Sequence, residues 1–149
     1  MIVITGATGH LGRGIVTSLL HRLPARQLVA SARNPEQATA LAEQGVQVRQ
    51  GDFADPASLA TAFAGATQVL VVSPNKLGAE GQQLSRHALE AARAAGARRV
   101  LYTSQVAAQT DSAFAPAVNH AAAEALLAGL GLPYTSLRNG YYAESALFH

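Results

Sequence analysis

Three glycines close to the N-terminus have a spacing that suits phosphate binding. They form a G-x-x-G-x-x-G pattern between an apolar run and a helix-like segment. The first glycine permits a tight turn, the second lets the backbone approach a pyrophosphate, and the third lets the helix pack closely on the strand. N–H groups at the start of that helix attract phosphates as well. The pattern predicts a dinucleotide site made of Gly6, Ala7, Thr8, Gly9, His10, Leu11 and Gly12. The alternative is a glycine-rich turn without a ligand.

The residues after the second apolar run indicate which dinucleotide would bind. In NAD-specific folds an acidic residue at this point holds the ribose 2′-hydroxyl. Here the run is followed by Arg33, Asn34 and Pro35, without an acid. The Arg33 guanidinium is suited to a 2′-phosphate through charge-assisted hydrogen bonds. We therefore expect NADPH as the cofactor, and the alternative is an exposed loop arginine.

Polar side chains follow the later apolar runs, at the edge where open parallel sheets bind ligands. Asp52 is placed to accept from an adenine amino group, or else to cap a turn. Ser73 and Asn75 are expected to contact the cofactor, with a solvated loop as the alternative. The hydroxyl of Thr103 could reach a nicotinamide ribose or a substrate, or simply end a strand.

His120 lies near the start of a helix-like segment, with Glu124 four residues further on and on the same face. A histidine at this place could steer or protonate a substrate, because its pKa lies near neutral pH. A surface histidine beside a carboxylate is the alternative. The five histidines do not have the spacing of helical metal ligands, so no metal site is predicted.

Elements of secondary structure alternate along the whole chain. Short apolar runs predict six strands, at Ile2–Thr5, Gln27–Ala32, Val46–Gln50, Gln68–Ser73, Arg99–Thr103 and Pro133–Arg138. Helices are predicted over 11–22, 35–44, 56–63, 80–95 and 117–128. Strands separated by helices pair in parallel through right-handed crossovers. The prediction is an α/β fold with a doubly wound parallel Rossmann sheet of order 3-2-1-4-5-6.

Composition limits the classes of protein that remain. The chain has 149 residues, which suits one domain over residues 1–149, and 49% are apolar. It has no cysteine, which excludes disulfides and thiolate metal sites, and its net charge of +2 comes without a basic run for nucleic acid. The apolar run Val69–Val72 is far too short for a membrane span, so a cytoplasmic protein is expected.

The chain resembles the NmrA-like atypical short-chain dehydrogenases, and especially the bacterial NADPH-dependent quinone oxidoreductases, with triphenylmethane-dye reductases nearby. The motifs that carry the resemblance are T-G-A-T-G-x-L-G at 5–12, R-N-P at 33–35, V-R-Q-G-D at 48–52, A-A-G at 94–96, Y-T-S at 102–104 and L-R-N-G-Y-Y-x-E at 137–144. They occur in the family's order along the whole chain.

The resemblance implies a Rossmann domain with a smaller C-terminal substrate part, and reduction of a quinone by NADPH. It implies that Gly6–Gly12 hold the pyrophosphate and Arg33 the 2′-phosphate. Asn139, Gly140, Tyr141 and Tyr142 would lie by the nicotinamide.

The chain also departs from the family. Its members run to nearly twice this length, so the substrate part is expected to be missing. The segment Asn139–Phe148 is expected to form a loop and the start of a helix, left for a longer chain or a second subunit to cover. Either truncation of a longer chain or homo-oligomerisation would explain why this segment has nothing to cover it. A lysine of related quinone reductases is replaced by Ala125.

Mechanistic expectations follow from a missing pair of residues. None of the four tyrosines has a lysine four residues on, so the Tyr-x-x-x-Lys pair of alcohol dehydrogenases is absent. A quinone needs less assistance, since hydride comes from the cofactor and the protein mainly orients the reactants. Tyr141 or His120 is predicted as the proton source. Two alternatives remain: a non-catalytic NADP(H)-binding, redox-sensing module, and a structural fragment that needs a second chain.

Overall fold

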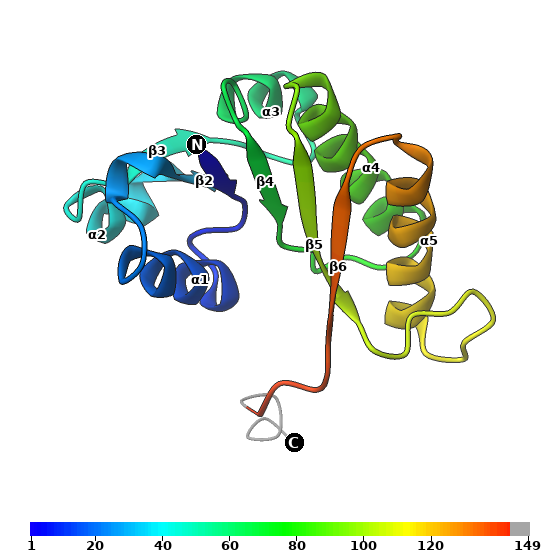
Figure 1. Cartoon of the computed structure of the whole chain (residues 1–149). Coiled ribbons are helices and arrows are strands. Elements are labelled where there is room, and N and C mark those ends of the chain that lie inside the picture. The colour runs from blue at the N-terminus through cyan, green and yellow to red at the C-terminus, as the bar shows by residue number, and fades with distance from the viewer. Residues whose placement is uncertain (144–149) are drawn as a thin grey trace.

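The computed structural model describes residues 1–143, which form a six-stranded sheet with helices on both faces (Figure 1). The strands lie in the order β3-β2-β1-β4-β5-β6, and every neighbouring pair is parallel. The predicted doubly wound order is therefore confirmed. The strand bounds are β1 Ile2–Ile4, β2 Leu28–Ala32, β3 Gln47–Gln50, β4 Gln68–Val71, β5 Arg99–Gln105 and β6 Tyr134–Asn139.

Two apolar cores, one on each face, hold the helices to the sheet. Successive strand residues point to opposite faces, so Val69 and Val71 belong to one core and Leu70 to the other. The first core contains Leu59, Leu89 and Leu127, which come from three different helices. The helices are α1 His10–Leu20, α2 Thr39–Ala42, α3 Pro56–Ala62, α4 Gly78–Ala94 and α5 Ala115–Gly129, with short 3₁₀ turns η1 Ala25–Gln27 and η2 Pro35–Ala38.

Some element boundaries differ from those predicted. The helix expected over 35–44 is divided into η2 and the single turn α2. Strand β5 continues to Gln105 and β6 to Asn139, because these two residues pair with each other at the end of the sheet. Glu144 and the helical start expected up to Phe148 lie outside the described residues.

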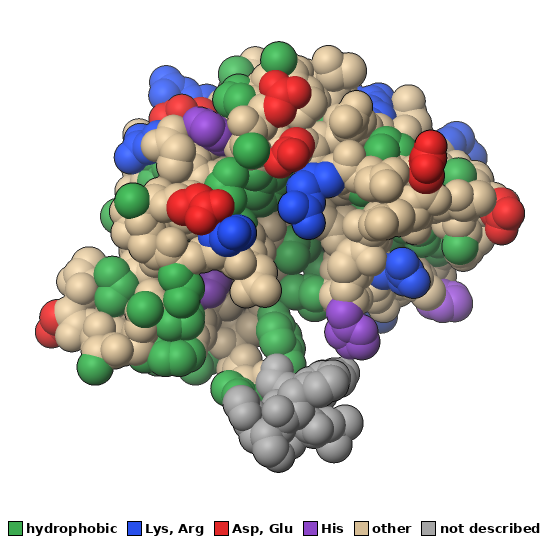
Figure 2. All heavy atoms as spheres, turned by 180° about the vertical axis from the view of Figure 1, so that it is seen from behind, with side chains coloured by type: hydrophobic (Ala, Val, Ile, Leu, Met, Phe, Trp, Pro, Cys, Tyr) green, Lys and Arg blue, Asp and Glu red, His purple; other side chains and the backbone are tan. Residues whose placement is uncertain are grey.

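Charge is spread over the molecule. Figure 2 shows acidic and basic side chains interspersed on the face seen from behind, which agrees with the scattered arginines of the sequence. None of the helices within residues 1–143 is long and apolar enough to cross a membrane.

Candidate functional site

The glycine motif forms a tight connection between β1 and α1. Gly6 has a φ of +60°, a conformation that favours glycine, and its carbonyl accepts from the Gly9 N–H at 3.0 Å. A Cβ at Gly12 would lie 2.2 Å from the Gly6 carbonyl oxygen, so only glycine fits there. Gly9 is the N-cap of α1 and has no side chain to occupy the first N–H groups of the helix. This cradle fits a pyrophosphate.

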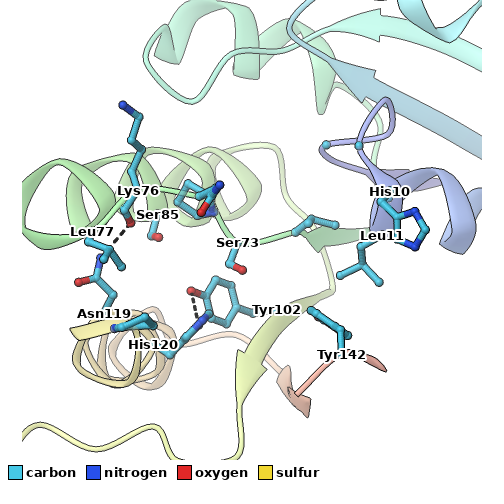
Figure 3. A pocket seen from close by; sticks show the side chains of 17 residues that line it. His10, Leu11, Ser73, Lys76, Leu77, Ser85, Tyr102, Asn119, His120 and Tyr142 are labelled. Carbon is cyan, nitrogen blue, oxygen red and sulfur yellow. Dashed lines mark hydrogen bonds between the residues drawn. The ribbon is translucent and has the colours of Figure 1, made fainter. Parts of the chain in front are cut away.

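A cavity of about 550 Å³ opens at the carboxyl ends of β1, β4 and β5. The glycine loop and the start of α1 form one wall, and the loop after β4 together with α4 and α5 forms the other (Figure 3). Its lining residues are Gly6, Gly9, His10, Leu11, Gly12, Val72, Ser73, Pro74, Asn75, Lys76, Leu77, Ser85, Tyr102, Pro116, Asn119, His120 and Tyr142. The cavity therefore joins a phosphate-binding loop to aromatic and polar side chains.

Tyr102 and His120 form a polar pair in the second wall. The Tyr102 hydroxyl lies 3.1 Å from Nδ1 of His120, and the rings pack edge to face with centroids 5.7 Å apart (Figure 3). Burial raises the pKa of Tyr102 to about 12, opposed by a hydrogen bond with Ser85. Burial also lowers the pKa of His120, although the charge of Glu124 works against this. Both side chains are thus uncharged at neutral pH.

Glu124 connects α5 to the last two strands. Its carboxylate accepts from Nε of Arg138 at 2.9 Å and from the Ser104 hydroxyl at 2.6 Å. The pKa of Glu124 lies below its ordinary value, chiefly because its carboxylate accepts hydrogen bonds from Arg138. Since Arg138 directly precedes Asn139, this ion pair fixes the end of β6 beside the cavity.

Nine of the predicted site residues come together around the cavity. They are Gly6, Gly9, His10, Leu11, Gly12, Ser73, Asn75, His120 and Tyr142. The other predicted residues do not line it; they are Ala7, Thr8, Arg33, Asp52, Thr103, Asn139, Gly140 and Tyr141.

Several of the latter have other hydrogen-bond partners, and Thr103 is one of them; its contact with the nicotinamide ribose or a substrate stays a prediction. Its hydroxyl accepts from the Ser73 backbone N–H at 2.9 Å and donates to the Ser73 hydroxyl at 3.2 Å, so it joins two strands instead of facing the cavity. Ala7 is buried, and its N–H donates to the Ser31 carbonyl. Asp52 accepts from the Ala54 N–H at 2.9 Å, the turn-capping alternative. Its contact with adenine stays a prediction.

The remaining predicted residues do not line the cavity. Arg33 is exposed directly after β2 and forms no ion pair within the part of the chain described. Asn139 donates to the Tyr142 hydroxyl at 3.0 Å, which turns that tyrosine toward the cavity. Tyr141 is 72% exposed, so the geometry favours His120 over Tyr141 as a proton source.

The cavity is also lined by three residues that were not predicted as site residues, Tyr102, Ser85 and Asn119. The period of two along β5 could have indicated Tyr102. Val100, Tyr102 and Ser104 lie on the same side of the strand, which faces the core that contains Leu89 and Leu127. Ser85 and Asn119 lie inside helices that have no motif, and only their packing brings them to the cavity.

Comparison with known proteins places the chain. A family model described as NAD(P)H-binding matches residues 6–146. The chain belongs to this NAD(P)H-binding family. Over 147 residues it is 45% identical to quinone oxidoreductase 2 of Escherichia coli, a match that covers 99% of this chain and 51% of the relative.

Two solved structures share the fold of this NAD(P)H-binding chain. Triphenylmethane reductase of Citrobacter sp., complexed with NADP(H), has a TM-score of 0.93 and 38% identity over 98% of this chain and 51% of its own. The NADPH-dependent quinone oxidoreductase QOR2 of E. coli, complexed with NADPH, has a TM-score of 0.92 and 43% identity. This match covers 99% of this chain and 52% of QOR2. The predicted resemblance is confirmed, and the chain spans about half the length of these relatives.

Proposed function

We propose that the chain binds NADPH and belongs to an oxidoreductase that transfers hydride to a quinone-type acceptor. The observation that carries the proposal is the single cavity that joins the glycine loop to the Tyr102–His120 pair. The likeness to quinone oxidoreductase 2 supports the choice of acceptor.

The residues present suit each part of the cofactor. The N–H groups at the start of α1 bind the pyrophosphate, and Arg33 pairs with the 2′-phosphate. Ser73 and Asn75 contact the opposite end of the dinucleotide, since they follow β4 at the cavity. NADPH supplies the hydride when bound, and the protein supplies orientation.

His120 completes the reduction. Reduction of a quinone to a hydroquinone takes one hydride, which leaves a hydroquinone monoanion, and one proton, which neutralises it. The Tyr102 hydroxyl stays protonated and lies 3.1 Å from Nδ1 of His120, a contact that orients the imidazole ring. The imidazolium form of His120 donates its proton to the hydroquinone monoanion and becomes neutral imidazole, and solvent then protonates the ring again. Leu77, Pro116 and Tyr142 provide apolar surface for the acceptor ring.

A titration of NADPH and NADH by fluorescence tests the cofactor. We expect tighter binding of NADPH, and Arg33→Ala should weaken NADPH binding by about tenfold or more without affecting NADH. Arg22→Ala, which removes another exposed arginine, is the matched control. Absence of NADPH binding would contradict the proposal.

Consumption of NADPH with 1,4-benzoquinone then tests the reaction. Turnover above the rate without protein is the expected result. Tight NADPH binding without turnover of any acceptor would instead favour the non-catalytic, redox-sensing alternative.

A further inference from the structure

The loop between β4 and α4 is anchored from α5 by one side chain. Asn119 donates to the Lys76 carbonyl oxygen at 3.3 Å (Figure 3). It also accepts from the backbone N–H of Gly78, the first residue of α4, at 3.0 Å. Both partners are backbone groups where the loop enters α4, so the bonds depend on the path of the chain there. The Lys76 side chain instead pairs with the exposed Glu80.

Close packing against α4 restricts the same backbone from a second side. Gly81 is buried in the first turn of α4, where a Cβ would lie 2.0 Å from the Lys76 carbonyl oxygen and 2.5 Å from Nδ2 of Asn119. Gly78 has a φ of +64°, a conformation that favours glycine. The contact of Asn119 with the loop therefore requires glycine at position 81.

The anchored loop forms part of the cavity wall. Ser73, Asn75 and Leu77 line the cavity, whereas Gly81 does not. Leu77 is 54% exposed and has little packing of its own to hold it in place. The position of this wall thus depends on the backbone contacts that Asn119 and the buried Gly81 make with the loop.

We infer that Asn119 is a positioning residue that sets the affinity for NADPH by holding the backbone of residues 76–78 against the cavity. The inference rests on the proposed NADPH binding. Two variants test it in different ways. Asn119→Leu removes the hydrogen bonds to the backbone, and Gly81→Ala displaces the loop without altering any residue that lines the cavity.

Titration of these variants with NADPH tests the inference. Asn119→Leu and Gly81→Ala should each raise the Kd about five- to tenfold, and Gly81→Ala, which alters no lining residue, should retain kcat at saturating NADPH. Gly14→Ala is the control, because its Cβ would meet nothing within 4 Å in the exposed part of α1, and its Kd should equal that of the wild type. An unchanged Kd in both variants would overturn the inference, and so would a change in Asn119→Leu alone.

Amide hydrogen exchange without cofactor provides a second test. It compares Asn119→Leu with the wild type, so it can be made even if Gly81→Ala does not fold. The Gly78 amide, which donates to Asn119, should exchange about five- to tenfold faster in Asn119→Leu than in the wild type, while the amides of β4 stay protected. Equal exchange of the Gly78 amide would overturn the inference. Failure of the wild type to bind NADPH would contradict only the proposed function, since the exchange experiment needs no cofactor.

Discussion

Burial keeps the side chains of Tyr102 and His120 uncharged in the cavity wall. Tyr102 is 1% exposed, and its pKa is raised to about 12. The pKa of His120 is lowered by the same physical cause, desolvation of the charged form. When the imidazolium form of His120 donates its proton, the ring becomes neutral, which is the form that burial favours.

Replacing His120 by Asn tests its proposed proton transfer. We expect kcat with 1,4-benzoquinone to fall about a hundredfold in mildly acidic buffer, where the wild-type imidazole is protonated, because general acid catalysis is lost. The affinity for NADPH should stay unchanged, since the glycine cradle is intact. Since burial lowers the pKa of His120, the imidazole is neutral above its ordinary value of 6.5, and any break in the wild-type pH profile should lie below that pH. The same break in His120→Asn would contradict the assignment.

Helix α1 and the glycine loop act as one element, because the helix begins in contact with the turn. Gly12→Ala would place a methyl group 2.2 Å from the Gly6 carbonyl oxygen. We expect the free energy of unfolding to fall by about 1–3 kcal/mol, as in other overpacked sites. NADPH affinity should fall too, and chemical denaturation with a parallel titration would measure both. Gly14→Ala, where space is open, should leave the NADPH affinity unchanged and raise the free energy of unfolding by up to about 1 kcal/mol, since alanine favours the helix.

The contact of α5 with β5 and β6 depends on pH. The pKa of Glu124 is lowered, chiefly by Arg138, so the carboxylate stabilises the fold above its ordinary pKa of 4.5. That stabilisation is lost as the pH falls through the lower value of the folded state. We expect Glu124→Gln to lower the Tm by a few degrees at neutral pH, and less in acid.

The exposed pair Arg86–Glu90 on α4 provides the control for this experiment. Its side chains are half exposed, and Glu90→Gln should not change the Tm measurably. If Glu124→Gln destabilised the protein equally at all pH values, the ionic contribution of Glu124 would be disproved.

At the scale of the whole molecule, the cavity lies where the strand order reverses, between β1 and β4. Open α/β sheets bind ligands at this point because the loops on its two sides diverge. Gly6 and Tyr142 line one cavity although almost the whole described chain separates them. A ligand there contacts both halves of the sheet.

NADPH should therefore stabilise the folded molecule as a whole. Free NADPH at about 100 times its Kd contributes about 2.7 kcal/mol, which corresponds to a rise in Tm of roughly 5–10 °C. Thermal unfolding with equal concentrations of NADPH and NADH measures the difference. A smaller rise is expected with NADH, and equal rises would contradict the assignment of the 2′-phosphate to Arg33.

The fold could be predicted from the sequence in most of its elements. The alternation of apolar runs with helical segments determined the number and order of the strands. The Asp55-Pro56 pair marked the start of α3, where the Asp55 carboxylate accepts from the Ala57 N–H at 3.1 Å. Boundaries that depend on pairing were less accurate, since Gln105 extends β5 only because Asn139 lies beside it.

The sequence by itself determined the glycine turn, because the backbone conformation of Gly6 and the close approach at Gly12 are local properties of consecutive residues. Tertiary structure alone decided which side chains face that turn. Asn119 reaches the backbone of Lys76, and Tyr102 reaches His120, through the packing of α5 on α4 and β5. Such contacts depend on how helices pack across long sequence separations, which no spacing along the chain records.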